Sequence, residues 1–170
     1  MFRRDPLADP APLIRRVYAY AAYRLGDGPE AEDATSETFE RALRYKKSYD
    51  PSKGEPVAWL LGIAKRCIDG SWSTTEYATE DVDSVDSTDV EEDTIRRLTV
   101  ARAVATLDER DRELVALRYG ADLTARQIAE LLGVRTNAIE VALHRALGRL
   151  RGVLGEELDA EPVRKRGASR

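Results

Sequence analysis

Residues 123–151 read LTARQIAELLGVRTNAIEVALHRALGRLR, two helical patterns on either side of a turn at Gly133. Thr124 and Gln127 have the spacing of a capping box, which begins a short helix, and Gly133 permits the sharp turn that ends it. The second helix is predicted over residues 136–154 and carries an apolar stripe at helical spacing. That stripe consists of Ile139, Leu143, Ala146, Leu147 and Leu150. The pattern predicts a helix-turn-helix.

The side of the second helix opposite this stripe is polar and basic. It carries Asn137, Glu140, Val141, His144 and Gly148, with Arg145, Arg149 and Arg151 on its flanks. A helix that reads DNA needs this division, because its own domain holds one face while the other meets base edges and phosphates. A helical hairpin that only packs a core shows the same stripe, and it remains the alternative.

Composition limits the class of protein. The 170-residue chain is 42% hydrophobic and 34% charged, which suits one soluble domain or two small ones. No apolar run approaches the roughly 18 residues of a membrane span. Residues 1–16 carry charges and three prolines where an export signal needs an apolar core, so we expect a cytoplasmic protein. One cysteine, Cys67, excludes an internal disulfide, and with a single histidine it predicts no zinc cluster.

The acidity of the chain is concentrated in one segment. Residues 73–94 contain nine carboxylates and no Lys or Arg, and they include few large apolar side chains. Such a segment buries too little surface to offset its ordering entropy, so it predicts a flexible linker. We therefore expect two domains, residues 1–72 and 95–156, followed by a disordered tail over 157–170.

Every other periodic segment also favours helix, and the predicted fold class is all-α. A helix over 12–25 places Ile14, Val17, Ala21 and Leu25 on one stripe and ends at Gly26. Helices opening at Pro29 and Pro56 follow. In the second half, helices over 94–106 and 108–119 precede the helix-turn-helix.

Three stretches together resemble a known family: AEDATSETFERAL (31–43), YDPSKGEPVAWLLGIAKRCID (49–69) and the sequence from LDERDREL to the end of the opening motif (107–151). They resemble the extracytoplasmic-function (ECF) sigma factors, bacterial transcription initiation factors, over nearly all of residues 10–155. The resemblance implies a helical region 2, a variable linker and a helix-turn-helix region 4. It also implies that the chain has no catalysis of its own, no cofactor and no membrane insertion.

The resemblance assigns expected roles to individual residues. The helix matching 31–43 contacts RNA polymerase in that family, the loop 48–55 captures a flipped base of the −10 element, and the helix 57–69 reads and melts that element. The polymerase-binding candidates are Asp33, Glu37, Phe39 and Arg41. The −10 candidates are Ser48, Tyr49, Lys53, Trp59, Lys65 and Arg66. The −35 candidates are Arg126, Arg135, Thr136, Asn137, Glu140, Val141, His144, Arg145 and Arg149. The implied partners are the beta and beta-prime subunits of core RNA polymerase, promoter DNA and an anti-sigma factor.

Some of these residues have simpler interpretations. Trp59 and Phe39 on apolar helices are typical core residues, and Cys67 is typical of a small buried hydrophobe. Lys65 and Arg66 lie at a helix C-terminus, where cations are favoured without DNA.

The sequence also departs from the family pattern. Glu140 and Ala142 stand where basic residues are common, and GSWSTTEY follows Asp69 where arginines are common. Two other functions therefore stay open: a dimeric regulator that binds operator DNA without polymerase, and a sigma-like polymerase adaptor that reads DNA weakly.

Overall fold

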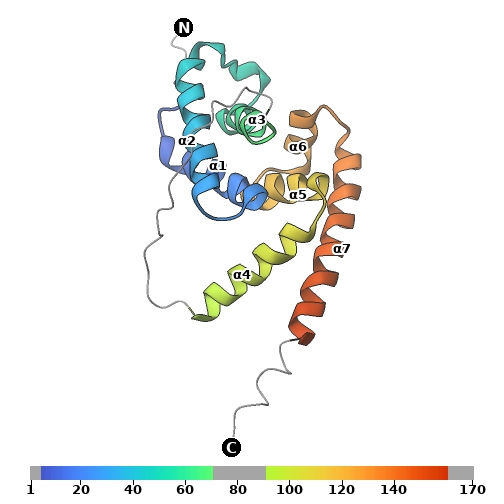
Figure 1. The fold of residues 1–170 in the computed structure, drawn as a ribbon. Helices are drawn as coiled ribbons and strands as arrows, with labels where there is room; N and C mark the ends of the chain where they lie inside the picture. The colour runs from blue at the N-terminus through green and yellow to red at the C-terminus, as the bar shows by residue number, and fades with distance from the viewer. Residues whose placement is uncertain (1–4, 71–90, 161–170) are drawn as a thin grey trace, which may run out of the picture.

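The computed structural model describes residues 5–70 and 91–160, and all of its regular elements there are helical (Figure 1). The N-terminal unit comprises α1 (Pro10–Leu25), α2 (Pro29–Arg44), the short turns η1 (Lys46–Ser48) and η2 (Pro51–Lys53), and α3 (Pro56–Ile68). The C-terminal unit comprises α4 (Glu91–Thr106), α5 (Glu109–Val115), η3 (Ala116–Gly120), α6 (Ala125–Leu132) and α7 (Thr136–Ala160). The described residues contain no strand, which confirms the all-α prediction.

Local signals begin and end these helices as the sequence predicts. Proline occupies the first turn of α1, α2 and α3, where its missing N–H costs nothing. The capping box of α6 is present: the Gln127 N–H donates to Thr124 Oγ1 (3.2 Å), and the Thr124 N–H donates to Gln127 Oε1 (2.9 Å). Gly133 ends α6 with a φ of 67°, a left-handed conformation that glycine adopts without strain.

Several predicted boundaries were wrong. Helix α4 begins at Glu91 and α7 runs to Ala160, so residues 91–94 and 157–160 are helical rather than linker and tail. Carboxylates are favoured in the first turn of a helix, so acidic composition does not mark where a linker ends. The rest of the predicted linker, residues 73–90, and the rest of the predicted tail, residues 161–170, lie outside the described residues.

The predicted helix 108–119 is divided. It consists of α5, capped by Asp108 Oδ1, which accepts from the Asp111 N–H (2.8 Å), and of the π-helical turn η3. Single π-helical turns of this kind occur inside α-helices. Here η3 lies against α1, which α5 and α4 also contact.

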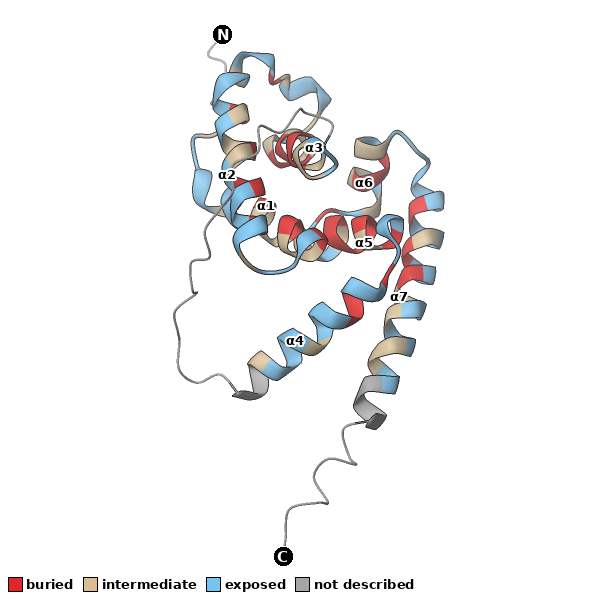
Figure 2. Ribbon diagram, in the orientation of Figure 1, coloured by how far each residue is buried: buried red, intermediate tan, exposed pale blue. Residues whose placement is uncertain are grey.

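The two units share one hydrophobic core. Tyr20, Leu60 and Leu61 of the N-terminal unit belong to the same buried cluster as Leu117 and Ile128 of the C-terminal unit. Figure 2 shows the buried residues gathered where α1 and α3 meet α5 and α6. A smaller cluster, built around Val104, Leu107 and Ala146, joins α4 to α7.

The apolar stripe predicted for α1 was partly wrong. Ile14 and Leu25 are 44% and 36% exposed, whereas Tyr20 and Arg24 are buried beside Val17 and Ala21. The buried face therefore includes an arginine, which needs a partner. None of the described helices is long and apolar enough to cross a membrane.

Candidate polymerase and nucleic-acid interfaces

Helix α2 presents a polar face that lies on the far side of the N-terminal unit from α5 and α6 (Figure 1). Asp33 is exposed, and Arg41 Nε donates to Glu37 Oε1 (2.9 Å) one helical turn away. Phe39 is half-buried and packs on the core. Of the predicted polymerase-binding residues, Asp33, Glu37 and Arg41 therefore lie at the surface, whereas the Phe39 ring packs α2 against the core.

The loop before α3 is held by short-range hydrogen bonds. Asp50 Oδ1 accepts from the Ser52 N–H (3.0 Å), and the Tyr49 hydroxyl donates to the Gly54 carbonyl (3.0 Å). The Tyr49 ring lies 5.4 Å from the Trp59 ring, centroid to centroid. The loop is therefore fixed against α3 through an aromatic pair.

A groove of about 680 Å³ runs between this loop, α3 and α6, and we call it the α3 groove. Five of the six predicted −10 residues line it: Ser48, Tyr49, Lys53, Trp59 and Arg66. Trp59 is half-buried: it packs on the core and also lines the groove. Its position is consistent with both a core residue and a residue that contacts a base.

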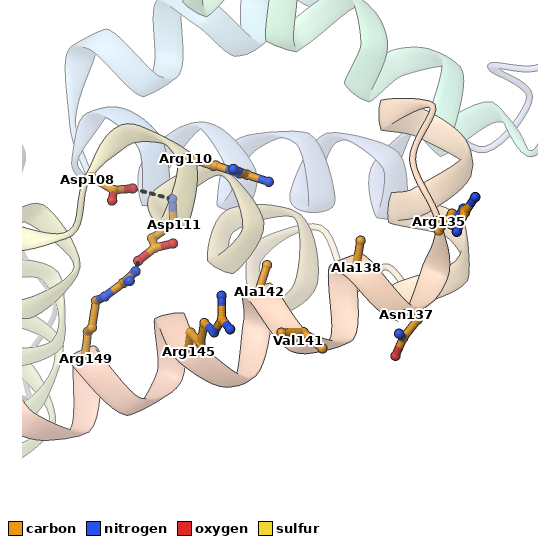
Figure 3. Close-up of a pocket in the computed structure, with 10 residues that line it drawn as sticks. All are labelled: Asp108, Arg110, Asp111, Arg135, Asn137, Ala138, Val141, Ala142, Arg145 and Arg149. Carbon is orange, nitrogen blue, oxygen red and sulfur yellow. Dashed lines mark hydrogen bonds and ion pairs between the residues drawn. The ribbon is translucent and has the colours of Figure 1, made fainter.

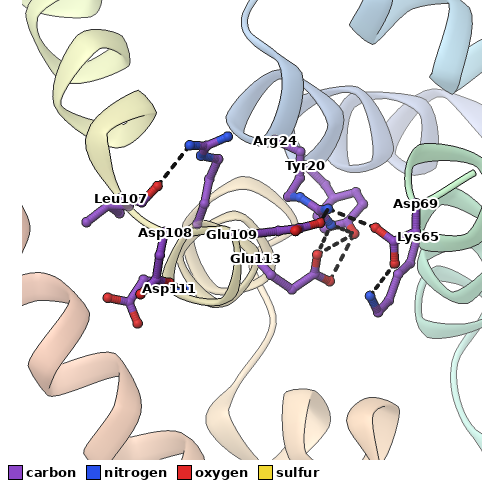
Figure 4. Close-up of polar contacts among 10 residues, drawn as sticks. Tyr20, Arg24, Lys65, Asp69, Leu107, Asp108, Glu109, Asp111 and Glu113 are labelled. Atoms are coloured by element: carbon purple, nitrogen blue, oxygen red, sulfur yellow. Dashed lines mark hydrogen bonds and ion pairs between the residues drawn. The ribbon is translucent and has the colours of Figure 1, made fainter.

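Lys65 is the exception among the −10 candidates. Its ammonium pairs with Asp69 (2.5 Å) and it lies away from the α3 groove, beside the buried network drawn in Figure 4. The structure therefore favours the interpretation in which Lys65 stabilises the C-terminus of α3 rather than contacting DNA.

The second wall of the α3 groove belongs to the C-terminal unit. Thr124, Arg126, Gln127, Glu130 and Leu131, all in or just before α6, line it. Arg126, a predicted −35 residue, is therefore placed beside the −10 candidates, and its Nε donates to Glu130 Oε1 (3.1 Å).

A second hollow, of about 540 Å³, lies between α7 and the start of α5, and we call it the α7 hollow (Figure 3). Four arginines line it, Arg110, Arg135, Arg145 and Arg149, together with Asn137 and Val141. Arg149 pairs with the buried carboxylate of Asp111. Thr136, Glu140 and His144 are exposed, but they lie outside the hollow.

Sequence reasoning missed Arg110, because it stands on α5 rather than on the predicted recognition helix. It also missed the network in Figure 4, where Arg24 of α1 pairs with Glu113 of α5 and with Asp69 (2.9 Å). The available signal was Arg24 itself, which follows Val17, Tyr20 and Ala21 at helical spacing on a buried stripe.

This network perturbs its own ionisable groups. Burial raises the pKa of the Tyr20 phenol, whose hydroxyl donates to Glu113 Oε1 (3.0 Å). Burial alone would raise the pKa of Asp69, but hydrogen bonds from Lys65 and Arg24 outweigh it and hold that pKa below 3.8. The described residues include no group of three or more His, Cys, Asp and Glu side chains suited to a metal ion.

The chain matches two family models in tandem, Sigma-70 region 2 over residues 12–70 and Sigma-70 region 4 over residues 97–150. It is 30% identical over 151 residues to the ECF RNA polymerase sigma factor SigK of Mycobacterium ulcerans, covering 82% of this chain and 80% of SigK. It is 29% identical over 150 residues to the ECF sigma factor BldN of Streptomyces coelicolor, covering 83% of this chain but only 57% of BldN.

Two solved structures share the fold. One is the sigma factor RpoE of Bartonella quintana in complex with the anti-sigma factor NepR, with a TM-score of 0.60, 19% identity, and coverage of 84% of this chain and 92% of that one. The other is CnrH in complex with the cytosolic domain of CnrY, with a TM-score of 0.56, 21% identity, and coverage of 89% and 82%. The order of the two matched regions and the identity to SigK lead to one conclusion: the chain belongs to the ECF family of RNA polymerase sigma factors, which bind core polymerase and direct it to promoters.

Proposed function

We propose that the matched regions divide promoter recognition between the α3 groove of region 2 and the α7 hollow of region 4. The observation that carries this proposal is the convergence on the α3 groove of five side chains, from a loop and a helix, that the family resemblance assigns to the −10 element. Aromatic rings beside cations are the combination that holds single-stranded bases.

In region 2, the loop and α3 would receive the unstacked strand of the −10 element. Trp59 offers a ring face, the buried Tyr49 ring supports it from behind, and Lys53 and Arg66 offer cations at the rim. Removing a base from the stack costs a few kcal/mol, so a preformed aromatic site lowers the cost of melting. This role would belong to residues 48–69.

In region 4, α7 would enter the major groove of the −35 element. Asn137 and Val141 face outward near its N-terminus, where a recognition helix meets base edges, and Arg135 and Arg145 lie beside them for phosphates. Glu140 is exposed on the same helix. A carboxylate there repels phosphates and accepts from a cytosine amine, so we expect a −35 element with a cytosine at that position.

Polymerase would bind through α2, with Asp33 and the Glu37–Arg41 pair at the contact. We assign this contact to the beta-prime subunit, and a further contact of region 4 to the beta subunit, in the cytoplasm where transcription occurs. An anti-sigma factor is a further expected partner, because the sigma factor RpoE of Bartonella quintana, which shares this fold, is bound to the anti-sigma factor NepR.

The test is run-off transcription on genomic fragments with purified core RNA polymerase. The wild-type chain is expected to produce discrete transcripts, and Arg66→Ala to lose them, because Arg66 lines the groove at the expected strand path. Arg15→Ala is the matched control, since Arg15 is an exposed cation on α1 outside both hollows. Co-elution with polymerase without any transcript would favour the adaptor instead. Equal loss in both variants would contradict the assignment of the groove.

A further inference from the structure

A further hollow, between α1 and α4, has no part in the proposed function. Its volume is about 570 Å³, and we call it the α1–α4 hollow. The last turns of α1 form one wall, and residues 96–105 of α4 form the other (Figure 1). This volume lies within the range of roughly 300–1,000 Å³ that is usual for sites that bind small molecules.

The walls of this hollow are mainly apolar. Most of its lining residues are apolar or aromatic, whereas most of those that line the α7 hollow are charged or polar. Val104 is buried there, and Tyr18 and Tyr23 are half-buried. Leu25 and Val100 also line the hollow, but they are 36% and 39% exposed. Exposed apolar side chains in a concave surface gain free energy when a ligand removes them from water, so the walls favour a ligand with an apolar body.

The charges that line the hollow are mainly positive. Four arginines stand against one carboxylate: Arg24, Arg96, Arg97 and Arg112 against Asp27. The Tyr18 hydroxyl donates to the Asp27 carboxylate, so the single anion already has a partner. Arg24 is paired with the buried Glu113, so the excess positive charge of the hollow lies on α4 and at Arg112. This charge complements a ligand that carries an anionic group.

Arg112 has donors that the protein itself does not use. Its Nη2 donates to the Ala105 carbonyl (2.8 Å) and to the Leu107 carbonyl (2.8 Å), which fixes the guanidinium at the end of α4. No described residue accepts from its Nη1, and its Nε is the only buried side-chain nitrogen or oxygen without a partner in the described part of the chain. Unused donors of this kind call for an explanation, and a carboxylate is the acceptor that binds a guanidinium most strongly.

We propose that the α1–α4 hollow binds a small anionic amphiphile, a molecule with one carboxylate or similar anionic head group on an apolar chain of medium length. The chain lies between Tyr23 of α1 and Val100 of α4, and the head group lies at Arg112. Such a ligand covers exposed apolar surface and also supplies an acceptor to the guanidinium. None of the residues that line this hollow lines the α3 groove or the α7 hollow, so the site is separate from the proposed DNA-binding surfaces.

The first test is isothermal titration calorimetry of the full-length protein with decanoate, below the concentration at which decanoate forms micelles. Decanoate is expected to bind at one site. Octanoate is expected to bind roughly tenfold more weakly, because it buries two fewer methylene groups. Decanol lacks the charge and decyltrimethylammonium reverses it, so both should bind at least several-fold more weakly than decanoate.

Ala101→Trp tests whether the ligand occupies the hollow. Ala101 lines the hollow and is exposed, so the indole ring fills the space without replacing a core side chain. This variant should bind decanoate at least tenfold more weakly than the wild type. Ala11→Trp is the matched control and should bind like the wild type, because Ala11 is exposed on α1 outside the hollow.

Arg112→Gln tests the position of the head group. It should weaken the binding of decanoate several-fold and leave the binding of decanol unchanged, because only the carboxylate uses the guanidinium. Arg102→Gln removes the same charge at an exposed position of α4 outside the hollow and should change neither affinity. If Arg112→Gln loses helical content in circular dichroism, because its bonds to the end of α4 are lost, Ala101→Trp alone decides.

Four results would overturn the inference. The wild type would fail to bind decanoate, Ala101→Trp would bind it as tightly as the wild type, or decyltrimethylammonium would bind as tightly as decanoate. The fourth is a dimer in sedimentation velocity that Ala101→Trp dissociates, which would assign the hollow to a second copy of this chain. None of these measurements uses polymerase or promoter DNA, so the inference succeeds or fails independently of the proposed function.

Discussion

The α3 groove and the α7 hollow differ in how they are built to meet nucleic acid. The lining of the groove includes three cations, Lys53, Arg66 and Arg126, and an equal number of carboxylates, Asp50, Glu55 and Glu130. The hollow sets four arginines against Asp108 and Asp111. The groove contains the aromatic pair Tyr49 and Trp59, and the hollow has no aromatic side chain among its lining residues.

This difference indicates that the α3 groove and the α7 hollow bind nucleic acid through different interactions. A balanced groove gains little from phosphate attraction, so stacking on its rings must supply most of its affinity for a single strand. A cationic hollow beside an exposed helix gains from counterion release, which depends steeply on salt. Residues of α6 in region 4 form one wall of the groove, whereas Arg135 and Asn137 of the hollow are exposed. The four predictions below test this contrast.

The largest expected effect comes from removing the buried guanidinium of Arg24, which joins α1 to α5 and to Asp69. Arg24→Ala leaves the Glu113 carboxylate buried, 8% exposed, without its guanidinium, and removal of one partner of a buried pair typically costs about 3–5 kcal/mol. We expect a decrease of that size in the free energy of unfolding, measured by urea denaturation. The control is Arg44→Ala, whose pair with Glu40 is exposed on both sides and contributes about 1 kcal/mol or less. Equal losses in the two variants would show that the buried pair between Arg24 and Glu113 stabilises the fold no more than an exposed pair does.

The second prediction concerns stacking in the α3 groove. Trp59→Ala is expected to lower open-complex formation about tenfold or more, because stacking contributes about 1–3 kcal/mol per base. The loss should change little between low and high salt. Trp59→Phe keeps a ring in the groove and should retain most of the activity. A strongly salt-dependent loss, or full activity in Trp59→Ala, would assign binding in the groove to its cations.

Only some of the features behind these predictions could be predicted from the sequence. The helices, the capping box at Thr124 and the turn at Gly133 follow from local chemistry within a few residues, so they were predictable. Ile14 and Leu25 share a stripe with the buried Val17 and Ala21 but are exposed, because a period alone does not say how far along a helix its partner surface extends. Gly120 could not be interpreted without the structure, in which a Cβ at this position would lie 2.9 Å from the Ala19 carbonyl oxygen.

The same limit applies to the site. Tyr49, Lys53, Trp59 and Arg66 converge because a loop folds against the helix that follows it, a short-range arrangement that a family pattern records. The surroundings of Arg126, beside the −10 candidates, and of Lys65, away from them, were not predictable, since they depend on how region 4 packs against region 2. That packing depends on contacts between residues about a hundred positions apart, such as Arg16 and Ala121. Such contacts produce no periodic pattern in the sequence.

The third prediction tests whether charge on α7 controls binding to the −35 element. Glu140→Lys should strengthen binding to a −35 duplex several-fold at low salt, because it replaces a repulsive carboxylate with a phosphate contact. The slope of log affinity against log salt should become steeper by about 1. Glu156→Lys makes the same charge change at an exposed position further along α7 and should leave the slope close to that of the wild type. Matching slopes in the two variants would mean that Glu140 does not face DNA.

The smallest expected effect is a pH dependence at Asp69, which follows α3 and pairs with Arg24 and Lys65. Its pKa is lowered below 3.8 in the folded chain by hydrogen bonds from Lys65 and Arg24, which outweigh the opposing effect of burial. A carboxyl with a lowered folded pKa stabilises the fold above its unfolded pKa, and that stabilisation disappears as pH falls through the folded value. Asp69→Asn should therefore unfold at lower urea than the wild type at pH 7, and the difference should shrink as pH falls below 3.8. The exposed Glu140→Gln should show no such convergence. A gap that stays constant with pH would mean that the Asp69 side chain stabilises the contact by its shape and hydrogen bonds rather than by its charge.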